Sequence, residues 1–236
     1  MIGTDFQKIE WNVAGLELLE PNAFFGDAFI LLASLYFYRR IQKTSLFNTL
    51  WAKFYLYFGL SFMLGGFGHL LFNYCGLWGK APSWLMGIVS TYYVEQAMLS
   101  LWIQANQKRL LLKISLLKML FFLILEVGLL LNVSSSQDPA IGLIIPTVNS
   151  IVGLGLTLGY LGYYYQREYH ADFRYFWHGS LVLLPNALVQ GMKINLHPWF
   201  DRNDLSHVLL IIGVSIYFVG VKKLSNYVAQ MQNMKP

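Results

Sequence analysis

The sequence contains little charge and almost no cysteine. Only 12% of its 236 residues are Asp, Glu, Lys or Arg, whereas 56% are hydrophobic. A soluble domain is about a quarter charged, so this composition lies outside the soluble class. Cys75 is the only cysteine, which excludes an intrachain disulfide and a zinc site built from several thiolates. The net charge of +5 comes without a run of basic residues, so we expect no nucleic-acid partner.

The hydrophobic residues fall in seven long segments, and each can cross a bilayer, which takes roughly 20 apolar residues. The expected spans are 21–40, 53–75, 83–104, 114–132, 139–164, 174–194 and 204–224. Short polar breaks separate them, and no repeat or long linker divides the sequence. The predicted fold class is therefore all-α: a polytopic membrane protein whose residues 21–225 form one bundle of seven transmembrane helices.

Lysine and arginine predict how this bundle is oriented. With the N-terminus outside, the inner loops and tail hold twelve of these residues, the outer segments hold four, and Lys118 lies within a span. Basic residues favour cytoplasmic loops, so we expect the orientation N-out and C-in. Residues 1–20 are then an extracytoplasmic segment and residues 226–236 a cytoplasmic tail, in an integral protein of an inner or plasma membrane.

A few ionisable side chains interrupt the expected spans, where burial in hydrocarbon is costly and usually has a functional reason. They are Asp27, His69, Glu95, Glu126, Asp204 and His207, with Asn149, Asn186, Gln190 and Asn203 as polar company. At 1.5 Å per residue, Asp27 and His69 lie roughly 10 Å below the outer ends of their spans. His207 lies about 5 Å below the outer end of the last span. Three spans thus bring two imidazoles and a carboxylate to similar depth.

Two imidazoles with a carboxylate suit a zinc site, in which an open position holds water. The metal offsets the burial of the carboxylate and lowers the pKa of the bound water. Asp204 and Asn203 lie three and four residues before His207, so either can share a helix face with it. Gly65 lies one turn before His69, where a small residue lets a neighbouring helix approach closely.

Structural roles compete with these assignments. His69 can hydrogen-bond a neighbouring span, and Asp204 can be the N-cap of the last helix. Glu126 can pair with a basic or amide neighbour such as Gln190, and Glu95 can belong to a deep polar network instead of taking part in chemistry.

Two histidine motifs are placed as in a known superfamily. Gly65-x-x-x-His69 lies late in the second span, and Asn203-x-x-x-His207 opens the last. The sequence thereby resembles the CREST superfamily of alkaline ceramidases and progestin/adiponectin receptors, which includes metal-dependent membrane hydrolases. That superfamily has SxxxH in the second span, an Asp near the start of the third, and HxxxH in the last. Here Gly65 replaces the serine, Asn203 replaces a histidine, and no Asp occurs near the start of the third span. EPNAFFGD (20–27), GGFGH (65–69) and NDLSH (203–207) also resemble the signature blocks of a seven-span bacterial family.

The CREST resemblance implies a metal site only if an acidic residue here has taken over a ligand position. We therefore expect zinc to be bound by His69, His207 and Asp27, with Asp204 or Glu95 as general base. The implied reaction is hydrolysis of an amide or ester bond of a lipid by zinc-bound water, so membrane lipids and a lipid substrate are the expected partners. The other residues expected to line the pocket are Glu126, Asn149, Asn186, Gln190 and Asn203.

Two other classes of function remain open. The polar cluster can be the pocket of a receptor or transporter that binds a small ligand or a proton, with Asp27 and His207 as a titrating pair. Alternatively, the protein can be a structural subunit of a larger membrane complex, in which the polar residues hold helices together.

Overall fold

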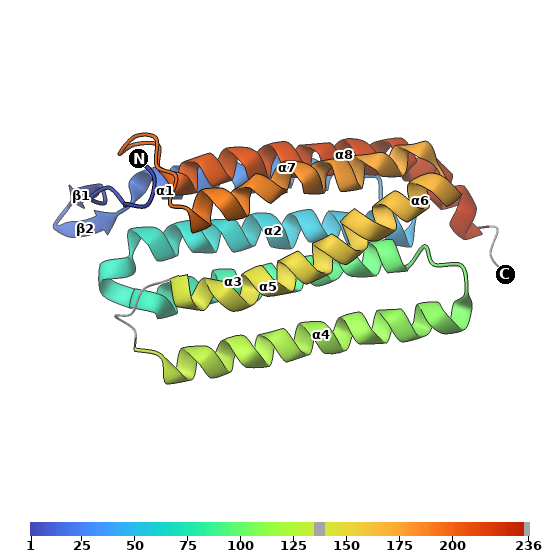
Figure 1. Ribbon diagram of the computed structural model, residues 1–236, viewed down its shortest axis with the longest axis horizontal. Helices are drawn as coiled ribbons and strands as arrows, with labels where there is room; N and C mark the ends of the chain where they lie inside the picture. Colours follow the sequence, from blue (N-terminus) through green and yellow to red (C-terminus); the bar gives the residue numbers. More distant parts are fainter. Residues whose placement is uncertain (135–139, 234–236) are drawn as a thin grey trace.

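The structure, a computed structural model, describes residues 1–134 and 140–233. Long helices that run side by side make up most of it (Figure 1). They are α1 (Pro21–Arg40), α2 (Leu46–Leu70), α3 (Phe72–Leu99), α4 (Ala105–Asn132), α5 (Ala140–Leu154), α6 (Gly162–Glu168), α7 (Arg174–Gly191) and α8 (Arg202–Asn233). The π-helix η1 (Gly155–Leu161) joins α5 to α6 in one continuous rod, and the short 3-10 turn η2 (Ala171–Phe173) precedes α7.

These helices lie where the hydrophobic segments predicted helices, so the predominantly helical fold is confirmed. Within residues 1–134 and 140–233, three helices are long and apolar enough to cross a membrane: Ala105–Asn132, Ile141–Glu168 and Arg202–Gln232. On α4, large hydrophobic side chains such as Leu117, Ile124 and Leu131 are exposed. Because water disfavours such a continuous apolar surface, the structure indicates that the protein associates with a membrane.

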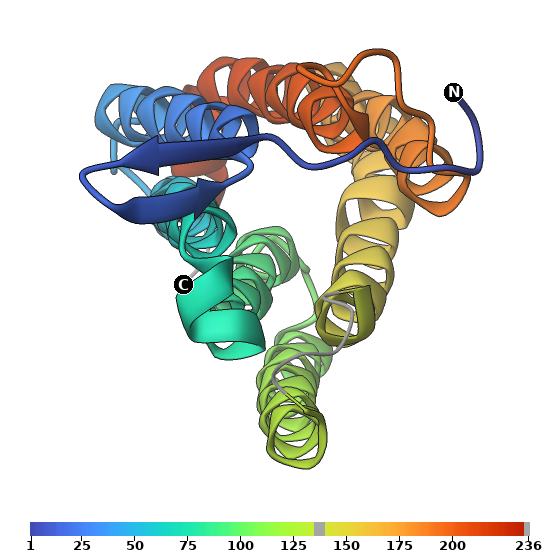
Figure 2. The same cartoon turned by 90° about the vertical axis from the view of Figure 1, so that its left-hand side faces the viewer.

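The N-terminal segment corrects the all-α prediction. Strands β1 (Glu10–Val13) and β2 (Leu16–Leu19) pair antiparallel. The two residues between them, Ala14 and Gly15, both have positive φ, at 50° and 81°, as the tightest hairpin turns require. The hairpin projects from the end of the bundle at which α1 begins (Figures 1 and 2).

Several helix boundaries also differ from the expected spans: α2, α3 and α4 begin seven to eleven residues earlier than expected, at Leu46, Phe72 and Ala105. The second span was expected to continue to residue 75, but α2 ends at Leu70, and α3 is kinked at Gly76, where φ is 53°. Residues 226–233, expected to be a tail, instead continue α8. The hydrophobic pattern located the helices correctly, but it does not mark where a helix stops inside an apolar run.

Most of the helices pack side by side in a ring. In order around it, contacts join α1, α2, α3, the α5–η1 rod, α7 and α8, and α8 returns to α1. Helix α4 lies outside this ring against α3 and α5 (Figure 2). The main core lies in the half remote from the hairpin, where Trp51 stacks on Phe176 at 5.1 Å and Tyr55 Oη donates to the carbonyl of Val214. The half nearer the hairpin holds the polar pairs described next.

Candidate functional site

A buried carboxylate and a buried imidazole meet where α1 and α8 cross. Asp27 is 3% exposed and His207 9% exposed, and His207 Nε2 lies 3.1 Å from Asp27 Oδ1. A methyl group on Gly26 would overlap His207 Nδ1, so the imidazole rests against the backbone of α1. Within residues 1–134 and 140–233, His207 Nδ1 has no hydrogen-bond partner. The structure therefore brings together two of the three residues expected to bind zinc.

Glycines of α2 make room for this pair. A Cβ on Gly66 would lie 3.1 Å from the Asp27 Cβ and 3.3 Å from its Oδ2. These distances are tighter than ordinary van der Waals contact, so a side chain at Gly66 would push the Asp27 side chain away by a few tenths of an ångström. At Gly65, the glycine for which a close helix approach was expected, an added Cβ would lie 3.0 Å from Ser83 Oγ of α3, so the close approach is confirmed there.

The third expected zinc ligand, His69, lies at a different place. Because α2 ends one residue later, His69 is at the mouth of the bundle, and the depth predicted for it was wrong. Its Nδ1 lies 2.6 Å from Oε2 of Glu20, and the ammonium of Lys80 lies 3.2 Å from Nδ1 and 3.3 Å from Nε2. Lys8 Nζ also contacts Glu20 Oε2, at 3.0 Å.

Several charged groups surround the second pair, Glu20 and His69. Burial raises the pKa of Glu20, but the hydrogen bond and charge of His69, together with the charges of Lys8 and Lys80, more than offset it and hold the pKa well below its usual range. Glu20 is also held in the left-handed backbone region, with φ of 49°, a conformation that non-glycine residues adopt at a cost. Sequence reasoning missed Glu20 because it considered only residues inside the spans, and Glu20 stands directly before Pro21, which opens α1.

Asp204 takes part in capping the N-terminus of α8. Asp201 Oδ1 accepts hydrogen bonds from the backbone N–H groups of Asn203 and Asp204, while Asp204 Oδ2 accepts one from the N–H of Asp201. This reciprocal arrangement is a capping box, so Asp201 is the N-cap, and the alternative that placed Asp204 there was wrong by three residues. Burial raises the pKa of Asp201. Asn22 Nδ2 donates to Asp204 Oδ2 at 2.8 Å and ties α1 to α8.

Gln190 extends this polar layer to α7. Its Nε2 donates to Ser206 Oγ at 2.7 Å and to Asn203 Oδ1 at 3.3 Å. Gln190 is thus a partner of α8, and the alternative that paired it with Glu126 finds no support in these contacts. Both carboxyl oxygens of Glu126, which is fully buried on α4, and Asn186 Oδ1 on α7 have no hydrogen-bond partner among the described residues.

Glu95 belongs to a separate network between α3, α4 and α5. Its Oε1 lies 2.6 Å from Lys118 Nζ, and Ser115 Oγ donates to its Oε2 at 2.6 Å. Lys118 also donates to Asn149 Oδ1 at 2.5 Å. Because Lys118 and Ser115 occupy the carboxylate, Glu95 is a helix-joining group, as the alternative of a deep polar network anticipated.

The candidate residues do not fit a zinc centre as they lie. Within residues 1–134 and 140–233, no three side chains of His, Cys, Asp or Glu come close enough together to hold a metal ion. Lys80 lies beside both ring nitrogens of His69, and a cation there opposes a metal ion. Zinc binding and the hydrolysis implied by it stay predictions.

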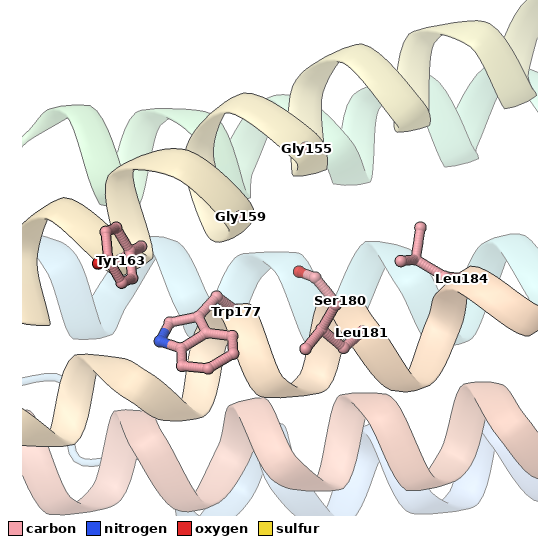
Figure 3. A pocket seen from close by; sticks show the side chains of 7 residues that line it. All are labelled: Gly155, Gly159, Tyr163, Trp177, Ser180, Leu181 and Leu184. Atoms are coloured by element: carbon pink, nitrogen blue, oxygen red, sulfur yellow. The ribbon is translucent and has the colours of Figure 1, made fainter.

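An apolar groove of 320 Å³ lies between η1 and α7 (Figure 3). Its lining residues are Gly155, Gly159, Tyr163, Trp177, Ser180, Leu181 and Leu184. The Ser180 hydroxyl is engaged with the Phe176 carbonyl and with the hydroxyl of Tyr217. None of the residues expected to line a pocket lines this groove.

The fold and the buried pairs define a class: a helical, membrane-associated protein with ionisable side chains buried between its helices. Residues 23–226 match a family described as "Family of unknown function (DUF6962)", and the protein belongs to that family. Neither a curated protein nor a solved structure matches the sequence.

Proposed function

We propose that the protein is a seven-span integral membrane protein, N-out and C-in, that works as a proton-binding receptor or transporter through the Asp27–His207 pair. The contact of 3.1 Å between His207 Nε2 and Asp27 Oδ1, in which the His207 side chain is 11% exposed and that of Asp27 4% exposed, supports this proposal. A proton added to or removed from such a pair changes the charge in a water-poor place.

The two charge states differ in how strongly α1 and α8 attract each other. A protonated imidazole forms an ion pair with Asp27, whereas a neutral imidazole leaves the carboxylate buried with only a hydrogen bond. Asn22 and Asp204 join the same two helices one layer above. The Glu20–His69–Lys80 group lies at the mouth of the bundle and sets the field through which a proton arrives. A shift in population between the two states is the proposed response.

The test uses Asp27→Asn and His207→Gln, with His178→Gln as the matched control because His178 is an exposed histidine of α7. Proteoliposomes that contain a pH-sensitive dye receive an external acid pulse. Hydrogen–deuterium exchange of α1 and α8 is measured in nanodiscs at pH 5 and pH 8, after correction for intrinsic exchange.

A transporter carries protons into the liposomes, and both site variants reduce the rate to that of protein-free liposomes while H178Q does not. A receptor carries none, but pH changes the protection of α1 and α8 in wild type and H178Q and not in the site variants. Absence of both effects in the wild type overturns the proposal.

A further inference from the structure

A basic pocket lies between the inner ends of α1 and α8. Its volume is 440 Å³, and its lining residues are Arg39, Arg40, Ile41, Gln42, Val221, Lys222, Ser225 and Asn226. Three of these side chains are cationic and none is anionic. Arg39 is about 18 Å along α1 from Asp27, so the pocket is separate from the Asp27–His207 pair.

The three cations are available to a ligand. Within residues 1–134 and 140–233, no ion pair includes Arg39, Arg40 or Lys222, and all three side chains are exposed. Arg40 lies 5.8 Å from the centre of the Tyr36 ring and Lys222 5.8 Å from that of Phe218. These ring contacts orient the cations and leave their N–H groups free to bind an oxyanion. Two neighbouring guanidinium groups suit the geometry of phosphate.

A hydroxyl group completes the lining. Asn48 Nδ2 donates to Ser225 Oγ at 2.7 Å, which fixes the position of this oxygen. Among the described residues, the Ser225 hydroxyl donates to no acceptor itself. It can therefore donate to an oxygen of a ligand held by the cations.

In a membrane that α1 and α8 cross, the pocket would lie at the depth of the lipid headgroups. Helix α1 has 20 residues from Pro21 to Arg40, which is about 30 Å of helix and equals the thickness of the hydrocarbon core. Along α8, the distance from Arg202 to Lys222 is also about 30 Å. Both helices therefore place their cations at the same membrane boundary, where phosphate is the abundant anion.

We propose that this pocket binds the phosphate group of an anionic phospholipid in the inner leaflet. The inference rests on the topology in the proposed function, in which α1 and α8 cross the membrane with the C-terminus inside, but it does not involve Asp27 or His207. A bound lipid joins α1, the first helix, to α8, the last, at the end of the bundle that holds Arg39, Arg40 and Lys222.

The test is native mass spectrometry of the full-length protein with phosphatidylglycerol, with phosphatidylcholine, and with inorganic phosphate alone. The variant Arg39→Gln/Arg40→Gln/Lys222→Gln removes the pocket charges. The control Lys108→Gln/Arg109→Gln/Lys113→Gln removes three charges from the inner end of α4, outside the pocket. Circular dichroism verifies folding, and the single variant R40Q replaces the triple variant if the latter does not fold.

The wild type is expected to prefer phosphatidylglycerol to phosphatidylcholine. Because each basic residue near a membrane surface contributes about 1 kcal/mol, the pocket variant should bind phosphatidylglycerol about 100-fold more weakly. The control should lose far less. Equal losses of phosphatidylglycerol affinity in the pocket variant and the control would mean that the lipid is held by diffuse surface charge, which overturns the proposal. An unchanged affinity of the pocket variant also overturns it. Binding of inorganic phosphate without binding of the phospholipid keeps a phosphate site but overturns the lipid assignment.

Discussion

At the scale of single residues, two carboxylates at the start of α1 each contact an imidazole. Glu20, which directly precedes α1, contacts His69 of α2, and Asp27 within α1 contacts His207 of α8. The first part of the chain after the hairpin therefore connects the second helix and the last through two carboxylate–imidazole contacts.

The Glu20 contact predicts how stability depends on pH. The pKa of Glu20 is below its unfolded value of 4.5, so the carboxylate stabilises the folded protein above about pH 4.5, and this contribution is lost as the pH falls below that value. Glu20→Gln should cost about 2 kcal/mol at pH 7, the worth of a hydrogen bond to a charged group. Thermal unfolding of detergent-purified protein at pH 7 and at lower pH measures both effects.

The matched control is Glu17→Gln, which changes an exposed carboxylate of the same hairpin. It should leave the melting temperature unchanged at every pH. The difference between wild type and E20Q should shrink as the pH falls below 4.5. A difference that stays constant down to the acid limit would show that Glu20 does not rely on its negative charge.

At the scale of helices, glycine determines how closely α1 and α8 approach. A methyl group on Gly26 would overlap His207 Nδ1, whereas Gly128 on α4 has no heavy atom within 4 Å of its ideal Cβ position. Gly26→Ala should therefore destabilise the protein by about 1–3 kcal/mol through overpacking. Gly128→Ala, the same substitution in open space, should raise stability by up to about 1 kcal/mol through helix propensity.

Thermal unfolding compares the stability of the two variants. The proton-transport and hydrogen-exchange assays on G26A show whether the displaced imidazole of His207 still responds to protons. G26A should behave like H207Q in those assays, because its methyl group pushes the ring away from Asp27. Unchanged melting of G26A would contradict the close packing of α1 against α8.

The proximity of Asp27 and His207 could be predicted from the sequence, because the position of a residue along a helix follows from where the helix begins. Helix α1 starts at the predicted residue and α8 starts two residues before the predicted one, so Asp27 and His207 lie at similar distances from the starts of their helices. His69 was misplaced because its helix ends inside the apolar run that continues through Leu70 to Phe72, where no polar residue marks a boundary. Glu20 and Lys80 lie outside the expected spans, and only the folded chain shows that they meet His69.

At the scale of the whole molecule, the two ends of the bundle differ in chemistry. The end with the hairpin holds the acidic groups Glu20, Asp201 and Asp204, each bound to a partner. The opposite end holds the basic pocket of Arg39, Arg40 and Lys222. Since basic residues favour the cytoplasmic side, the hairpin end is expected outside.

The only cysteine gives a direct test of this orientation. Cys75 is exposed and lies at the start of α3, at the end near the hairpin. A membrane-impermeant maleimide should label it in intact cells. The double variant Cys75→Ser/Gln104→Cys moves the thiol to an exposed position before α4, at the opposite end, and should be labelled only after permeabilisation. The reverse pattern would place the N-terminus inside, and the Asp27–His207 pair would then receive its proton from the cytoplasm.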